Sequence, residues 1–281
     1  MRWTPGGRSS NLEDRRSSGG GMGLPLGVGG TVVVLVLSLL TGHNFFNDVG
    51  GATGAGAAQG APLSPQDSAA EEPEVQFVSF VLDDVQNTWA RILPKEGVSF
   101  HPAKLAIFRN STDTGCGTAQ SAMGPFYCPL DEHVYIDLGF YEELKDKFGA
   151  SGDMAQAYVI AHELGHHVQH LTGLDGQVRQ RQEQHPDEAN ALSVRLELQA
   201  DCYAGVWANS TSQRNILEQG DLNEALTAAS SVGDDRIQQR TQGSVNVDSF
   251  THGSAAQRSQ WFKRGFDSGD PKSCDTFAGA V

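Results

Sequence analysis

The most constraining feature of this sequence is the five-residue stretch His162-Glu163-Leu164-Gly165-His166. Two histidines four positions apart on an α-helix project from the same side, one turn above the other. Their imidazoles are then spaced to bind a single zinc ion, and the glutamate beside them can take a proton from a zinc-bound water. Only three positions of this His-Glu-x-x-His pattern are fixed, so the rest of the chain must supply the remaining parts of such a site.

The first missing part is a third protein ligand, since catalytic zinc usually takes three and keeps one position for water. One extension of the pattern places a histidine six residues after the second, but Thr172 occupies that position and excludes the class. Glu197 and Asp201, four residues apart, share a helical face. We predict that Glu197 completes the site of one zinc ion and that Asp201 orients a ligating histidine. An ordinary solvent-facing carboxylate pair is the alternative.

Other residues near the motif are candidates for supporting roles. We interpret His167 and His170 as polar neighbours, because ligands on three successive turns, each rising about 5.4 Å, span too far for one ion. A metal-dependent hydrolase that attacks a carbonyl also needs a hydrogen-bond donor for the oxyanion. His252, in a Thr-His-Gly-Ser segment, is one candidate, and Tyr158 and Tyr203 are others.

The N-terminal part of the chain carries a membrane signal. Residues 24–40 contain no charged side chain and are rich in leucine and valine. These 17 residues are at the short end for a transmembrane helix. Because arginines precede the stretch and none follows closely, we expect a signal anchor with a cytoplasmic N-terminus and an extracytoplasmic catalytic domain. A cleaved signal peptide and a buried core helix are the alternatives, although no good small-x-small site directly follows the apolar run.

The expected organisation of the chain has four parts. Residues 1–23 are basic and glycine-rich and are predicted to form a disordered cytoplasmic tail. The transmembrane signal anchor follows at 24–40, then a Gly/Ala/Pro-rich linker at 41–74, and a zinc metallopeptidase domain at 75–281. The net charge of −14 makes nucleic acid a poor partner. It also makes an anionic lipid surface a poor partner for the domain. The expected partners are a peptide or protein substrate and, through residues 24–40, the lipid bilayer.

Hydrophobic periodicity predicts an α+β, helix-rich domain with a small sheet packed on the motif helix. That helix is opened by Asp153 and closed by Gly173. Polar or glycine-rich composition predicts loops at 111–130 and 174–186. Alternation predicts a strand at 134–138, which is either an edge to which an extended substrate adds or a strand that only packs under the motif helix. The other predicted strand is 105–108, and the other predicted helices are 76–93, 187–209, 221–231, 234–241 and 255–266.

The chain contains four cysteines, Cys116, Cys128, Cys202 and Cys274. In an extracytoplasmic domain an even number suggests two disulfides, for which three connectivities exist. Pairing Cys116 with Cys128 closes a glycine-rich loop and leaves Cys202 with Cys274, which ties the C-terminal tail to the predicted Glu197 helix. A cysteine zinc site is the alternative, but no Cys-x-x-Cys spacing supports it.

Two long segments carry a family resemblance. Residues 155–169, AQAYVIAHELGHHVQ, and 195–205, RLELQADCYAG, resemble the bacterial "putative neutral zinc metallopeptidase" family. The resemblance covers nearly the whole chain except the linker. It implies a zincin-like fold of the gluzincin type, a membrane anchor and peptidase activity, without naming a substrate. Further similar segments lie at 1–3, 12–16, 124–129, 233–236 and 251–254.

The sequence therefore predicts a membrane-anchored zinc metallopeptidase in which Glu163 is the general base. Two other hypotheses remain open. One is a catalytically silent zincin-like adaptor or binding protein, against which the intact Glu163 argues, since binding alone needs no base. The other is a zinc hydrolase that cleaves a non-peptide amide, for example in cell-wall material.

Overall fold

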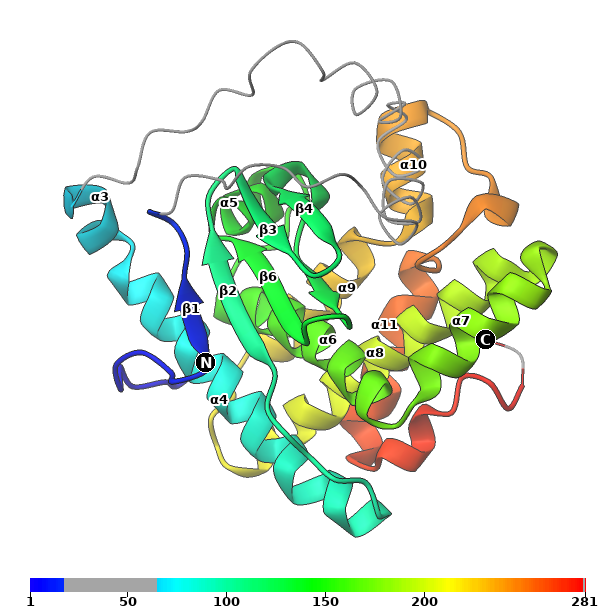
Figure 1. Cartoon of the computed structure of the whole chain (residues 1–281), viewed down its shortest axis with the longest axis horizontal. Helices are drawn as coiled ribbons and strands as arrows, with labels where there is room; N and C mark the ends of the chain where they lie inside the picture. Colours follow the sequence, from blue (N-terminus) through cyan, green and yellow to red (C-terminus); the bar gives the residue numbers. More distant parts are fainter. Residues whose placement is uncertain (18–64, 280) are drawn as a thin grey trace.

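The computed structural model describes residues 1–17, 65–279 and 281 (Figure 1). The predicted anchor at 24–40 and the linker up to residue 64 lie outside the described residues. Within the described ranges, no helix is both long and apolar enough to cross a membrane.

Helices dominate the described residues and surround a small sheet, which confirms the predicted helix-rich α+β class. The helices are α3 (Pro65–Ala70), α4 (Glu72–Ile92), α5 (Gly139–Asp146), α6 (Asp153–Leu171), α7 (Leu174–Gln184), α8 (Ala189–Gln213), α9 (Asp221–Ser231), α10 (Asp234–Gln242) and α11 (Ala255–Ser268). The strands are β1 (Leu12–Asp14), β2 (Lys104–Phe108), β3 (Ser111–Thr114), β4 (Gly117–Gln120), β5 (Phe126–Cys128) and β6 (His133–Asp137).

Four strands form the main sheet in the order β1-β2-β6-β5, and β3 and β4 form a separate hairpin. β1, β2 and β6 run parallel, whereas β5 runs antiparallel to β6. Apolar side chains of β2 and β6, such as Ile107 and Ile136, share one core with α4 and with the motif helix α6. The sheet thus packs on the motif helix, as the sequence predicts.

The prediction that strand 134–138 is an open edge is wrong. β6 lies between β2 and β5, so both of its sides are already paired. The edge strand on the side of α6 is β5, which falls inside the segment 111–130 that was predicted to be a loop. The glycines and prolines of that segment mark the turns between short strands, and a strand of three or four residues is too short to show alternation.

The prediction of a disordered tail is also wrong for residues 1–17. Leu12–Asp14 add a parallel strand to the outer side of β2. Arg16 is almost fully buried because Asp14 and Glu71 accept hydrogen bonds from its guanidinium, at 2.7–2.9 Å. A basic composition favours disorder only while its charges stay unpaired, and here they are neutralised by specific carboxylates.

Two further boundaries differ from the prediction. The last part of the predicted linker is helical, since α3 and the first residues of α4 precede residue 75. The predicted loop 174–186 is mostly the helix α7, of which only Val178 is buried. Its glutamine, arginine and glutamate residues are good helix formers. Because they form no apolar face, the sequence of this surface helix shows no hydrophobic periodicity from which the helix could be predicted.

The half-buried carboxyl of Glu74 on α4 makes the stability of the fold pH-dependent. Burial raises the pKa of Glu74 from 4.5 to about 7. Between these values the folded state binds more protons than the unfolded state, so the free energy of unfolding falls as the pH rises. We expect Glu74→Gln to raise that free energy by about 1–2 kcal/mol at pH 8 and to leave it unchanged near pH 4. Urea denaturation at both pH values measures this, with the exposed Glu183→Gln as control.

Candidate active site

The motif helix α6 and helix α8 approach closely at the site. A Cβ added to Gly165 would meet the Cα of Ala200 at 3.1 Å, so the glycine inside the motif lets the two helices pack nearly backbone to backbone. This contact lies beside Glu197, the candidate ligand on α8. The close approach therefore brings a glutamate of α8 within reach of two histidines of α6.

The three predicted ligands converge. Oε2 of Glu197 lies 3.2 Å from Nε2 of His162, and Oε1 lies 3.5 Å from Nε2 of His166. One candidate ligand atom from each residue lies within 4.8 Å of the other two. Two imidazole nitrogens and one carboxylate oxygen form a donor set that fits zinc.

The other nitrogen of each imidazole is held by a neighbouring side chain. Nδ1 of His162 bonds Oδ1 of Asp201 at 2.8 Å, and Nδ1 of His166 bonds Oε1 of Gln169 at 2.9 Å. Gln169 in turn donates to the carbonyl of Leu196 on α8, at 2.8 Å. Because both Nδ1 atoms are engaged, the two Nε2 atoms are left for a metal, and the ring orientations are fixed before it binds.

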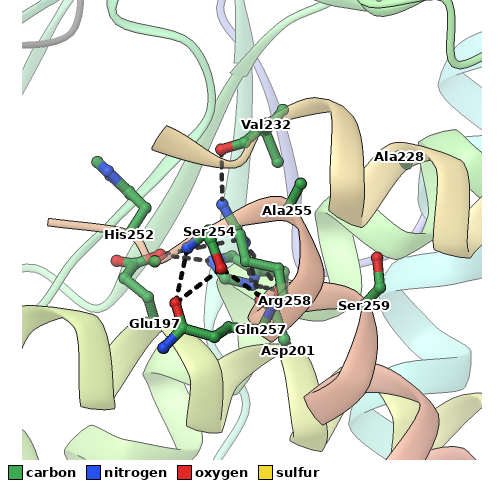
Figure 2. A network of polar contacts seen from close by, with 12 residues as sticks. Glu197, Asp201, Ala228, Val232, His252, Ser254, Ala255, Gln257, Arg258 and Ser259 are labelled. Carbon is green, nitrogen blue, oxygen red and sulfur yellow. Dashed lines mark hydrogen bonds and ion pairs between the residues drawn. The ribbon is translucent and has the colours of Figure 1, made fainter. Parts of the chain in front are cut away.

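A buried arginine on α11 supports Asp201. Arg258 donates from Nε to Oδ2 of Asp201 at 2.8 Å, and from Nη2 to Oδ1 at 3.0 Å. Figure 2 shows its guanidinium between Asp201 and Val232, whose carbonyl accepts from Nη1 at 3.3 Å. Tyr158 also donates its hydroxyl to Asp201. Burial alone raises the pKa of Asp201, but Arg258 and His162 outweigh that effect and lower it, so the carboxylate stays charged.

The two glutamates of the site have opposite pKa shifts. Glu163 is buried, and desolvation raises its pKa. Burial also acts on Glu197, but the neighbouring His166, His252 and His162 outweigh it and lower the pKa of Glu197 well below its ordinary value. The carboxylate of Glu197 therefore stays charged, as a metal ligand must be, whereas Glu163 has the higher proton affinity that a general base needs near neutral pH.

Of the three candidate oxyanion donors, His252 is placed best. It lines the cavity, and Asp234 at the start of α10 bonds its Nδ1 at 3.2 Å and its backbone N–H at 2.6 Å. Tyr158 also lines the cavity, but its hydroxyl already donates a hydrogen bond to Asp201 and is not available to an oxyanion. Tyr203 packs against Trp89 and is not among the cavity-lining residues.

These side chains open into a cavity of about 440 Å³. One part of its wall is mainly apolar and comes from β5 and the segments on either side of it, from α5, α6, α8 and α10, and from the connection between α9 and α10. The apolar lining residues are Met123, Pro125, Phe126, Tyr127, Pro129, Phe140, Val159, Leu196, Val232 and Ile237. Apart from the site residues above, Asp175 and Arg179 of α7 line it as well.

The four cysteines form two disulfides, Cys116–Cys128 and Cys202–Cys274. The first ties the β3–β4 hairpin to the end of β5, which lines the cavity. The second joins Cys202, the residue after Asp201 on α8, to Cys274 in the C-terminal segment. All four cysteines are thus consumed, and the two His/Glu clusters that could hold a metal among the described residues contain none of them.

Arg258 and Asp234 are the site residues that sequence reasoning missed. Arg258 lies 57 residues after Asp201, so no helical spacing connects the two. The available signal was the helix start itself, because Ser254 and Gln257 form a capping box that fixes the first turn of α11. An arginine directly after such a box, three residues from Ala255 and so on the same side of the helix, is a candidate for an inward-facing cation.

The carboxylate of Asp201 makes a testable contribution to metal affinity. Replacing it in Asp201→Asn removes the charge that holds His162 and takes from Arg258 the nearest carboxylate that it pairs with. We expect zinc affinity to fall by about 10–100-fold, since supporting carboxylates of ligating histidines contribute that much. Competition with a chromogenic chelator measures the dissociation constant. Equal affinities in variant and parent would show that Asp201 does not orient the ligand.

The fold and the site together define a zincin-like protein in which two histidines and one glutamate are the candidate metal ligands. Residues 1–277 match the family described as "Putative neutral zinc metallopeptidase", and the chain belongs to this family. It is 50% identical to the uncharacterized protein YpfJ of Escherichia coli K12 over 294 aligned positions that cover all of both chains. It is 45% identical over 209 positions to the uncharacterized protein Rv2575 of Mycobacterium tuberculosis, covering 70% of this chain and 69% of the relative. No solved structure matches the chain.

Proposed function

We propose that this protein is a zinc-dependent peptidase. The observation that carries the proposal is the convergence of His162, His166 and Glu197, with the buried carboxyl of Glu163 directly beside them. A binding protein would need the three ligands but not a buried glutamate of raised pKa. When bound at these residues, zinc supplies Lewis acidity.

The side chains of the chain itself then carry the proton transfers. Glu163 accepts a proton from the attacking water and delivers it to the nitrogen of the leaving amine. His252 donates an N–H to the oxyanion that forms on the carbonyl oxygen. Burial alone lowers the pKa of His252, but Glu197 and Asp234 outweigh it and raise that pKa, which favours the donating form.

The shape of the cavity supports an extended peptide as substrate. β5 is the edge strand next to α6, and two of its residues, Phe126 and Tyr127, line the cavity. An extended chain can add to a sheet edge through main-chain hydrogen bonds while its side chains enter neighbouring pockets. Because the wall near β5 is apolar, we propose cleavage next to an apolar side chain.

Digestion of a random peptide library by the full-length chain tests the proposal. We expect cleavage at sites flanked by apolar residues, its loss on adding a chelator, and its return on adding zinc. Peptides left intact by the zinc-loaded protein would favour the adaptor hypothesis. Release of amine from cell-wall material, with the library still uncut, would favour the hydrolase of non-peptide amides.

We further propose that residues 24–40 hold the protein at a membrane, with the catalytic domain outside the cytoplasm. The uncharged apolar run and the arginines before it support the anchor. Two disulfides support an oxidising compartment for the domain. Strand β1 sets a condition on this arrangement. A single crossing puts residues 1–17 and the catalytic domain on opposite sides of the bilayer, whereas the pairing of β1 with β2 needs both on the same side. Insertion of residues 24–40 across the bilayer therefore requires that β1 leaves β2.

Cysteine labelling in intact cells tests this topology. Ser10 is an exposed residue of the N-terminal segment. Lys95 is an exposed residue of the catalytic domain and lies just after the end of α4. With a membrane-impermeant thiol reagent we expect Lys95→Cys to be labelled and Ser10→Cys to be protected. Protection of Lys95→Cys would place the domain in the cytoplasm, and labelling of both would show that β1 stays with the domain on the outer side.

A further inference from the structure

A second cluster of metal-binding side chains lies beside the catalytic site but uses other residues. His101 precedes β2, Glu132 lies in the turn between β5 and β6, and His167 follows His166 on α6. Nε2 of His101 lies 2.5 Å from Oε2 of Glu132. One candidate ligand atom from each of the three side chains lies within 4.8 Å of the other two. Consecutive residues on a helix point about 100° apart, so His167 faces different partners from His166.

His170, one turn further along α6, is oriented toward the same cluster. Its Nδ1 bonds Asp175 at 2.8 Å, and its Nε2 lies 3.8 Å from the second oxygen of Glu132. The arrangement repeats that of His162, whose Nδ1 is held by Asp201 while its Nε2 faces a glutamate. In the second cluster the carboxylate of Glu132 thus faces the imidazoles of His101 and His170, and the carboxylate of Asp175 holds the ring of His170 in place.

We propose that His101, Glu132 and His167 bind a second zinc ion, with His170 available as a fourth ligand. Imidazole nitrogens and a carboxylate oxygen suit zinc better than they suit magnesium or calcium. The site is weaker than the catalytic one, because both ring nitrogens of His167 are already hydrogen-bonded. Nε2 bonds the carbonyl of His101 at 2.8 Å and Nδ1 bonds the hydroxyl of Tyr127 at 3.0 Å, so the ion must displace one of them.

Equilibrium dialysis of the full-length chain against rising concentrations of buffered free zinc tests the proposal. We expect two ions per chain, bound in separate steps. His101→Ala and Glu132→Gln should each remove the weaker step and keep the tighter one, whereas Glu197→Ala should remove the tighter step only. His185→Ala, which replaces an exposed histidine after α7, is the matched control and should bind two ions.

The proposal is overturned if the parent saturates at one ion, since the His101–Glu132 contact is then an ordinary hydrogen bond. It is also overturned if His101→Ala still binds two ions in two steps. Loss of the tighter step in Glu197→Ala with the weaker step intact separates this site from the catalytic one, so the second site can fail while the proposed peptidase stands.

Discussion

Glu163→Gln is expected to lower kcat/KM for a cleaved peptide by about 10²–10⁴-fold, the usual contribution of a general base. The amide keeps the size of the side chain but cannot take a proton from water. Because Glu163 lies beside the three ligands but is not one of them, zinc affinity should stay within a few-fold of that of the parent. Kinetics on a peptide from the library digestion and chelator competition on the same preparations measure both quantities.

The control for this variant is Glu197→Ala, which removes a ligand. It is expected to lose both hydrolysis and the tight zinc, whereas Glu163→Gln should lose hydrolysis alone. A Glu163→Gln protein that cleaves as fast as the parent would exclude Glu163 as the base. Thermal unfolding of the apoprotein of each variant would reveal a folding defect. The unfolding midpoint should not fall, because Gln carries no carboxyl whose ionisation burial opposes.

The candidate site was largely predictable because its ligands follow helical geometry. His162 and His166 are one turn apart, and Thr172 leaves a glutamate on a later helix as the remaining solution. Once Glu197 is chosen, helical spacing places Asp201 one turn further along α8. Each step is a local rule about one helix, and such rules can be read from a single sequence.

The parts that were missed depend on contacts between distant segments. β1 forms because one side of β2 is free to pair with it and because Arg16 donates a hydrogen bond to Glu71, 55 residues away. Arg258 reaches Asp201 across the interface between α11 and α8. The position of β6 inside the sheet depends on which strands pair with it, and composition carries no information about that pairing. The residue types of these segments were thus readable from the sequence, but their partners were not.

The interface between α8 and α11 gives the largest expected effect on stability. A Cβ added to Gly265 on α11 would lie 1.9 Å from the carbonyl oxygen of Cys202, and one added to Gly205 on α8 would lie 2.0 Å from the carbonyl oxygen of Phe262. Both obstacles are backbone atoms, which no side-chain rotation can relieve. Gly265→Ala must therefore push the helices apart, and we expect a loss of about 3 kcal/mol or more in the free energy of unfolding.

The same variant should weaken the metal site, since Arg258 is on α11 and its partner Asp201 is on α8. Separation of the helices lengthens their hydrogen bonds, so we expect weaker zinc binding in whatever fraction of Gly265→Ala remains folded. The control is Gly176→Ala on α7, where an added Cβ meets nothing within 4 Å. It should gain about 0.5–1 kcal/mol, because alanine is the better helix former. Urea denaturation measures the free energy of unfolding of both variants, and chelator competition measures their zinc affinity. Equal midpoints for Gly265→Ala and the parent would mean that the two helices are not packed backbone to backbone.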